Sequence, residues 1–260
     1  MDGLLRDKAV LVSGVGPGLG RTTALRCARA GADVVLAARD GERLDAVAAE
    51  VAALGRRAVA VPADITDEES AAALAARAVD AFGRLDALVN NATAGIPPAD
   101  LATVDLGAFA AGMGVDVVAA LRLTRLLAPA LAERGGAVVM VASSVIRESP
   151  PGLGVYKTVK SALVAVAQTL SAELGPGGVR VNTVAPGPLW ADAVKAHFAA
   201  VAEQRGVPLR QVYDETAATI DRRRLTEPDE AADAIVFLVS DLARAVTGHC
   251  LDVNGGQYHN

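Results

Sequence analysis

Short apolar segments rich in valine alternate with longer alanine- and leucine-rich segments along the whole chain. The short segments have the pattern of buried strands, and the longer ones have the pattern of helices that cover them. Strands that alternate with helices form βαβ units, so the sequence predicts an α/β fold with a parallel sheet. No linker, repeat or low-complexity tract interrupts the pattern, and residues 1–260 are expected to form one domain. The expected strands are residues 9–12, 33–37, 58–61, 85–89, 136–142, 179–184 and 250–253.

Composition argues against several classes of function. Hydrophobic residues make up 52% of the chain and aromatic residues only 3%, so the core must consist mainly of alanine, valine and leucine. The formal net charge of -5 gives no support for nucleic acid or a membrane as a partner, and we expect no segment that spans a bilayer. Cys27 and Cys250 stand far apart without metal-ligand spacing, so no metal site is expected. The start of the chain lacks the features of a signal peptide, which predicts a cytoplasmic protein.

A glycine-rich turn, residues 14–20, follows the first expected strand and precedes a helix. Glycine permits a tight turn and a close approach of the backbone to a pyrophosphate, and the helix that follows presents N–H groups and its positive dipole end. An ordinary turn between a strand and a helix would seldom carry so many glycines. The turn therefore predicts a dinucleotide site. Its expected cofactor-binding residues are Gly14, Gly16, Pro17, Gly18, Leu19 and Gly20.

A serine, a tyrosine and a lysine are expected to converge at the end of the fifth strand. Ser143 follows residues 136–142, and Tyr156 and Lys160 are four residues apart in a helical segment, hence one turn apart on one face. Ligands of open α/β sheets bind outside the carboxyl ends of the strands. A nearby ammonium favours the phenolate form of a tyrosine, which suits general acid–base catalysis. An ordinary surface pair on a helix has the same spacing, so this motif needs support from others.

The chain resembles the short-chain dehydrogenase/reductases over nearly its whole length. The motifs that carry the resemblance, in order and spacing, are Gly14-x-x-x-Gly18-x-Gly20, Asn90-Asn91-Ala92, Ser143, Tyr156-x-x-x-Lys160 and Pro186-Gly187. The resemblance implies a single Rossmann-like, doubly wound domain, with a seven-stranded parallel sheet and helices on both faces. It also implies a nicotinamide cofactor, hydride transfer between a carbonyl compound and a secondary alcohol, and a homotetramer.

The resemblance also implies roles for individual residues. Tyr156 would be the acid/base, Lys160 would assist it and hold the nicotinamide ribose, and Ser143 would position the substrate oxygen, with Ser144 as its competitor. Further residues are expected to line the cofactor: Asp64 and Ile65 at the adenine, Asn90 and Ala92 along the cofactor, and Pro186, Gly187 and Leu189 at the nicotinamide.

Three positions depart from the family pattern: Asp116, Thr93 and Ala191, the last of which stands where a threonine often contacts the cofactor amide. Asp116, in the long helix before the fifth strand, replaces an asparagine that usually takes part in a water relay to the lysine. That relay is thought to use the backbone carbonyl, so an aspartate can serve, and we count Asp116 among the catalytic residues. A carboxylate near Lys160 would stabilise the charged form of the lysine. Thr93 replaces the usual glycine after Asn-Asn-Ala.

The choice of cofactor depends on the end of the second strand. A free 2′-hydroxyl is usually held by an acidic residue there, whereas a 2′-phosphate needs a cation. Ala38 occupies the expected acidic position and Arg39 follows it, which favours NADP(H) over NAD(H). Asp40 and the absence of a basic residue at Pro17 weigh against this, and Arg39 could also be an ordinary surface arginine.

Residues 189–227 form an insert that we expect to be a substrate lid. Val194, Phe198 and Val201 are spaced as a helical stripe, which more often indicates packing than a ligand surface. Trp190 is the better pocket candidate, and His197 is expected to be structural.

The sequence thus predicts an NAD(P)-dependent oxidoreductase that acts on a small carbonyl or alcohol substrate. The alternative from another class is a catalytically silent dinucleotide-binding regulator or scaffold, against which the intact Ser143, Tyr156 and Lys160 argue. An epimerase or dehydratase of the extended branch is disfavoured by the short chain and by the glycine spacing.

Overall fold

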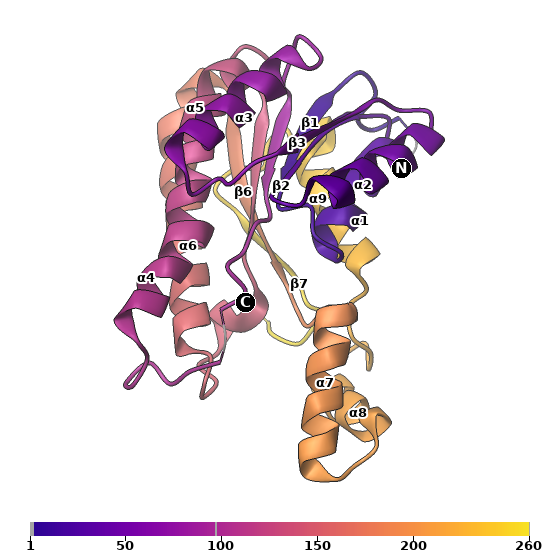
Figure 1. The fold of residues 1–260 in the computed structure, drawn as a ribbon, viewed down its shortest axis with the longest axis vertical. Coiled ribbons are helices and arrows are strands. Elements are labelled where there is room, and N and C mark those ends of the chain that lie inside the picture. Colours follow the sequence, from indigo (N-terminus) through magenta and orange to yellow (C-terminus); the bar gives the residue numbers. More distant parts are fainter. Residues whose placement is uncertain (1–2, 97, 260) are drawn as a thin grey trace.

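The computed structural model, which describes residues 3–96 and 98–259, contains one seven-stranded parallel sheet (Figure 1). Its strand order is β3-β2-β1-β4-β5-β6-β7, so the chain builds outward from β1 in one direction and then returns to build in the other. This arrangement confirms the doubly wound fold. The strands are β1 (Ala9–Ser13), β2 (Asp33–Ala38), β3 (Ala58–Pro62), β4 (Ala87–Asn90), β5 (Ala137–Val141), β6 (Arg180–Pro186) and β7 (Cys250–Val253).

Helices cover both faces of the sheet because successive strand residues point to opposite sides. Val10 and Val12 of β1 belong to one buried cluster, and Leu11 belongs to another. The first cluster includes residues of α1 (Leu19–Arg29), α2 (Gly41–Ala53) and α9 (Pro228–Val239). The second includes residues of α3 (Glu68–Asp80), α5 (Ala120–Ala132) and α6 (Gly154–Leu174). Short 3₁₀ turns lie at η2 (Ser144–Arg147), η3 (Gly175–Gly177) and η4 (Asp241–Ala243).

The long helix predicted before β5 has three parts, namely α4 (Leu106–Met113), the π-helical segment η1 (Gly114–Ala119) and α5. The π-helical turn contains Asp116, and π-helical turns occur often at functional sites. The continuous stretch Leu106–Ala132 is long and apolar enough to cross a bilayer by length and composition alone, a property that the sequence analysis did not anticipate. A core helix of a soluble protein passes the same test, and Leu123, Leu127 and Leu131 are fully buried in the second cluster.

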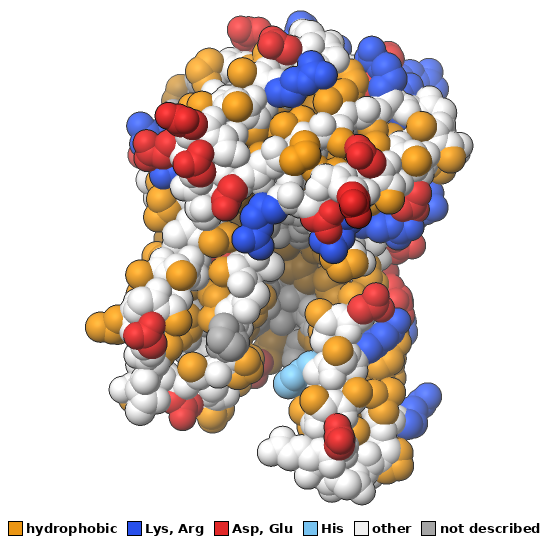
Figure 2. All heavy atoms as spheres, in the orientation of Figure 1, with side chains coloured by type: hydrophobic (Ala, Val, Ile, Leu, Met, Phe, Trp, Pro, Cys, Tyr) orange, Lys and Arg blue, Asp and Glu red, His pale blue; other side chains and the backbone are white. Residues whose placement is uncertain are grey.

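The predicted insert forms two helices, α7 (Asp192–Arg205) and α8 (Leu209–Ala218), which project beyond the ends of the strands (Figure 1). The insert begins and ends where Leu189 bridges Thr226, and the Trp190 N–H donates to the Thr226 carbonyl over 2.9 Å. The two helices share a small apolar cluster of their own. Figure 2 shows that the molecule is hollowed between this hairpin and the part that carries α4.

The buried carboxylate of Asp33 connects the amino-terminal ends of β2 and β3, away from the expected site. Asp33, at the start of β2, accepts a hydrogen bond from the Arg57 backbone N–H over 3.0 Å and pairs with the Arg56 guanidinium over 2.8 Å. Burial alone would raise the pKa of Asp33, but the hydrogen bonds and charges of Arg57 and Arg56 outweigh it, so the pKa lies below its ordinary value. These contacts fasten the residues before β3 to β2.

We expect Asp33→Asn to lower the free energy of unfolding at neutral pH by roughly 1.5–3 kcal/mol, the usual worth of hydrogen bonds to a charged group. Because the folded pKa is lowered, this stability is fully present above the unfolded pKa near ~3.9 and is lost as the pH falls through the folded value. Urea unfolding of both proteins between pH 7 and pH 3 measures the difference.

The matched control is Asp45→Asn, because Asp45 is exposed on α2. It should leave the unfolding free energy nearly unchanged. A difference between wild type and Asp33→Asn that stays constant down to pH 3 would contradict the electrostatic account.

Candidate functional site

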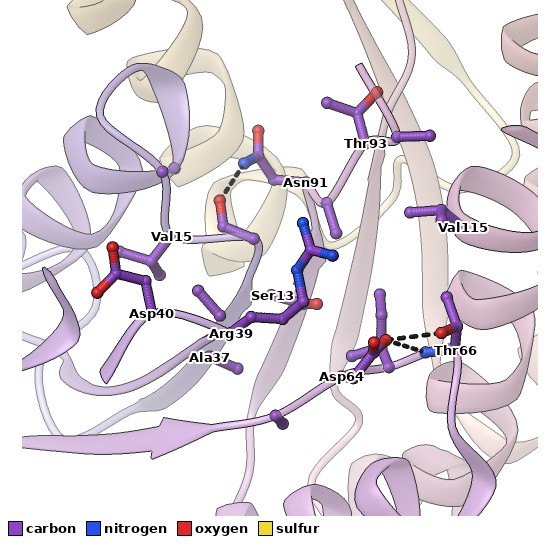
Figure 3. A pocket seen from close by; sticks show the side chains of 18 of the residues that line it. Ser13, Val15, Ala37, Arg39, Asp40, Asp64, Thr66, Asn91, Thr93 and Val115 are labelled. Carbon is purple, nitrogen blue, oxygen red and sulfur yellow. Dashed lines mark hydrogen bonds between the residues drawn. The ribbon is translucent and has the colours of Figure 1, made fainter. Parts of the chain in front are cut away.

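A cavity of about 890 Å³ lies at the carboxyl ends of β1, β2 and β4 (Figure 3). It collects most residues that were predicted to bind the adenosine and phosphate part of a cofactor. These are Gly14, Gly16, Gly18, Leu19, Gly20, Arg39, Asp64, Ile65 and Ala92. The cavity is also lined by residues that the sequence analysis did not assign to it: Ser13, Val15, Ala37, Ala38, Asp40, Arg43, Ala63, Thr66, Asn91, Thr93, Ala94, Ala111 and Val115.

Close contacts between backbone atoms near the start of α1 require glycine at two positions. Gly14 has a φ of 89°, and a Cβ added there would lie 2.4 Å from the Ala92 backbone nitrogen. A Cβ added at Gly20 would lie 2.2 Å from the Gly14 carbonyl oxygen. The Asn91 side chain donates to that same carbonyl over 2.7 Å. The glycine-rich turn is thus pressed against the loop after β4, and the Asn-Asn-Ala motif was the signal that could have identified Asn91.

The residues of the cavity fit a dinucleotide. The buried Ser13 Oγ has no hydrogen-bond partner within the described ranges, and Ser13 lines the cavity. Because the glycines have no side chains, a ligand can approach the backbone closely where α1 begins. The free N–H groups at the start of a helix can donate hydrogen bonds to a pyrophosphate. An orphaned hydroxyl, bare backbone and a helix N-terminus together form a site for a phosphorylated ligand.

Arg39 is the cation available at the adenosine end. It is exposed in the cavity and forms no ion pair or hydrogen bond with any residue that the structure describes (Figure 3). Asp40, by contrast, accepts from the Arg43 N–H over 3.1 Å as the N-cap of α2 and pairs with the Arg43 guanidinium over 3.0 Å. Hydrogen bonds from Thr66 hold the pKa of Asp64 below its ordinary value, and the charge of Arg39 adds to this.

The serine, tyrosine and lysine lie at the neighbouring strand end, outside this cavity. Ser143 is half-buried and caps η2, where its Oγ accepts from the Val145 N–H over 3.3 Å, whereas Ser144 is buried. Tyr156 and Lys160 stand on α6, which packs against η2, and the Lys160 ammonium lies 5.8 Å from the centre of the Tyr156 ring. The greater exposure of Ser143 favours it over Ser144 as a substrate contact.

Lys160 forms a buried ion pair with Asp116. The Lys160 Nζ lies 2.8 Å from Asp116 Oδ2 and donates a hydrogen bond to the Val141 carbonyl over 3.1 Å. Asp116 Oδ2 also accepts from the Thr93 hydroxyl over 3.0 Å, and Asp116 Oδ1 accepts from the Ala94 N–H over 2.8 Å. The expected proximity of Asp116 to Lys160 is confirmed, whereas the contact with Thr93 was not predicted.

Asn90 does not join the cavity. It is buried, and its Nδ2 donates to the Thr124 hydroxyl over 3.1 Å and to the Met140 sulfur over 3.2 Å. Its Oδ1 is buried without a hydrogen-bond partner among the residues described. The side chain therefore joins β4 to β5 and α5. Its expected role as a cofactor contact gains no support from this arrangement.

The residues expected at the nicotinamide follow β6 rather than lining the large cavity. Pro186 ends β6, and the Gly187 N–H donates to the Val253 carbonyl over 3.0 Å. A Cβ added at Gly187 would lie 3.0 Å from the Asn254 Cα, so the turn passes close to the segment after β7. Leu189 forms the bridge at the base of the hairpin. Pro17 also lies outside the cavity lining.

Trp190 packs within the hairpin. Its ring centre lies 4.7 Å from that of Tyr213 and 5.8 Å from that of Phe198. The apolar stripe is packing, as predicted, and Trp190 belongs to the same cluster. His197 is exposed on α7. No group of three or more His, Cys, Asp or Glu side chains arranged to hold a metal occurs in the part of the chain that the structure covers.

A family model and the sequences of known proteins point to the same family of oxidoreductases. A family model described as enoyl-(acyl carrier protein) reductase matches residues 14–258. The chain is 37% identical over 269 residues to L-rhamnose 1-dehydrogenase (NAD(P)(+)) of Azotobacter vinelandii, covering 99% of both chains. It is 32% identical over 254 residues to the 7alpha-hydroxysteroid dehydrogenase of Escherichia coli K12, covering 97% of this chain and 94% of the other.

A solved structure agrees with this. A 7alpha-hydroxysteroid dehydrogenase complexed with NADH and 7-oxo glycochenodeoxycholic acid superposes with a TM-score of 0.88 at 30% identity, covering 100% of this chain and 98% of the other. The strand order, the cavity and the Tyr156–Lys160 pair are in keeping with this match. The chain belongs to the short-chain dehydrogenase/reductase family and is a nicotinamide-dependent oxidoreductase acting between alcohols and carbonyl compounds.

Proposed function

We propose that the protein is an NADP(H)-dependent oxidoreductase that interconverts a small carbonyl compound and its secondary alcohol, with Tyr156 as the acid/base. The observation that carries the cofactor preference is the unpaired Arg39 in the cavity beside an Asp40 that its own helix already engages. The name of the L-rhamnose 1-dehydrogenase includes NAD(P)(+), and the 7alpha-hydroxysteroid dehydrogenase structure contains NADH. The preference for NADP(H) proposed here therefore rests on this chain's own residues.

The residues divide the work of the reaction. A bound nicotinamide dinucleotide would supply or accept the hydride. Ser143 would donate a hydrogen bond to the substrate oxygen, and Tyr156 would give its hydroxyl proton to that oxygen in reduction or take it back in oxidation. The Lys160 ammonium lies 5.8 Å from the centre of the Tyr156 ring, where its positive charge would attract the negative charge left on the Tyr156 oxygen after the proton has moved.

The hollow beside the hairpin supports a small-molecule substrate and a lid function for residues 189–227 (Figure 2). The names of the relatives suggest sugars and hydroxysteroids as a first panel. The second candidate, a silent dinucleotide-binding regulator, has no observation in its favour, because Ser143, Tyr156 and Lys160 are all present. Cofactor turnover with a panel of ketones and alcohols distinguishes the two.

Tyr156→Phe should abolish most turnover while cofactor binding survives. The phenol is the proposed proton donor, and general acid–base catalysis typically contributes about 10²–10⁴-fold to the rate. We expect kcat to fall by about that factor, with calorimetry showing unchanged cofactor affinity and circular dichroism showing an intact fold. A variant that kept nearly the wild-type kcat would rule out Tyr156 as the acid/base.

Arg39→Asp should shift the preference from NADPH toward NADH. The substitution removes the proposed partner of the 2′-phosphate and adds repulsion, so the loss should be at least that of a charged hydrogen bond, roughly 1.5–3 kcal/mol, or about tenfold to a hundredfold in affinity. Isothermal titration with both cofactors measures it, and NADH affinity should change little.

The control for this charge change is Arg77→Asp, because Arg77 is exposed on α3 away from the cavity lining. It alters the net charge equally and should leave both affinities unchanged. An NADPH affinity that Arg39→Asp does not alter would remove Arg39 from the site.

We also propose a homotetramer in the cytoplasm. The support for association is the largely apolar helical stretch Leu106–Ala132. Three of its large hydrophobic side chains are exposed, namely Leu106, Val118 and Leu126. Exposed apolar surface of this kind often marks an interface.

Light scattering should therefore give the mass of four 26.4 kDa chains. Leu126→Glu places a charge on the proposed interface and should reduce this mass, whereas Leu54→Glu, at the end of α2, should not. A wild-type protein with the mass of one chain would refute the assembly.

A further inference from the structure

Two protein groups lie next to the Lys160 ammonium. It forms an ion pair with Asp116, with Nζ 2.8 Å from Oδ2, and it donates a hydrogen bond to the Val141 carbonyl over 3.1 Å. The side chain is only 4% exposed. The charge of the carboxylate and the hydrogen bond to the Val141 carbonyl together restrict where the ammonium can lie.

Asp116 is itself fully buried, and a buried carboxylate is costly unless its oxygens accept hydrogen bonds. Two hydrogen-bond donors and one cation compensate it. The Ala94 N–H donates to Oδ1, the Thr93 hydroxyl donates to Oδ2, and the Lys160 ammonium forms an ion pair with Oδ2. They come from the loop after β4 and from α6, while Asp116 comes from the π-helical turn, so this carboxylate joins three segments that are distant in sequence.

Thr93 connects the buried pair to the dinucleotide cavity. Its hydroxyl has one proton, which goes to Asp116, while the residue is exposed and lines the cavity (Figure 3). Thr93 and Asp116 are two of the three positions where the sequence departs from the family pattern, and the structure places them in contact. Each departure explains the other, because a carboxylate at 116 needs a donor that a glycine at 93 lacks.

We infer that Thr93 is a positioning residue for Lys160, and that Thr93 and Asp116 act as one unit. The Thr93 hydroxyl holds the Asp116 carboxylate, and the carboxylate holds the Lys160 ammonium in place for its ligand. This inference rests on the proposed function, since Lys160 matters for its assistance to Tyr156 and its contact with the cofactor.

The unit makes a distinctive prediction. Thr93→Val keeps the shape but leaves the buried carboxylate one donor short, so it should weaken NADPH binding and lower kcat by about tenfold or more. Asp116→Asn retains an amide oxygen that can accept from Lys160, so kcat should stay within about tenfold of wild type. In the Asp116→Asn background, Thr93→Val should have a clearly smaller effect, because no buried charge then loses its donor.

A double-mutant cycle over Thr93→Val and Asp116→Asn tests this with three measurements, namely the NADPH dissociation constant, kcat, and the unfolding free energy of the cofactor-free protein. Thr93→Ser keeps the hydroxyl and should behave as wild type in all three. Thr103→Val is the control, because Thr103 is exposed in the same loop. Among the residues described, its hydroxyl donates a hydrogen bond only to the Asp100 carbonyl. If Thr93→Val does not fold, Thr93→Ala takes its place.

Additive effects in all three measurements, or a loss in Thr93→Ser equal to that in Thr93→Val, would overturn the inference. Coupling in unfolding alone, without coupling in NADPH affinity or kcat, would reduce Thr93 to a structural residue and would also overturn it. Because cofactor affinity is measured without turnover, the cycle is informative even if Tyr156→Phe shows that the proposed acid/base is wrong.

Discussion

The proposed chemistry depends on a cation that the fold keeps almost out of water. Burying an ammonium costs several kcal/mol unless partners compensate it, and Lys160 has Asp116 and the Val141 carbonyl as partners. These contacts tie α6 to the end of β5 and to the π-helical turn. Tyr156 stands one turn earlier on α6, so the position of its ring is set by the same helix.

The parallel sheet explains why the cavity and this centre share one edge. The strand order reverses at β1, which pairs with β2 on one side and with β4 on the other. The carboxyl ends of the strands at such a point open the space in which dinucleotides bind. The large cavity lies at β1, β2 and β4, while Ser143 follows β5 and Pro186 ends β6. A ligand that extends from Arg39 toward Lys160 would thus follow the strand ends in order.

The sequence predicted the features that local pattern determines. Valine-rich runs identified the strands, and the glycine spacing identified the turn where Gly14 passes against Ala92. The contacts that depend on three-dimensional packing were missed. The π-helical turn has no composition signal, and the inward direction of the Asn90 side chain depends on Thr124 and Met140 across the layer. The bond from Thr93 to Asp116 joins positions 23 residues apart. The family pattern flagged both positions, but only the structure showed that they meet.

The most direct test of this account is a crystal structure of the protein with NADPH. The account predicts that Lys160 contacts the Asp116 carboxylate without an intervening water molecule and donates a hydrogen bond to the nicotinamide ribose. It also predicts that Arg39 contacts the 2′-phosphate. A water molecule between Lys160 and Asp116, together with an ammonium turned away from the ribose, would contradict it.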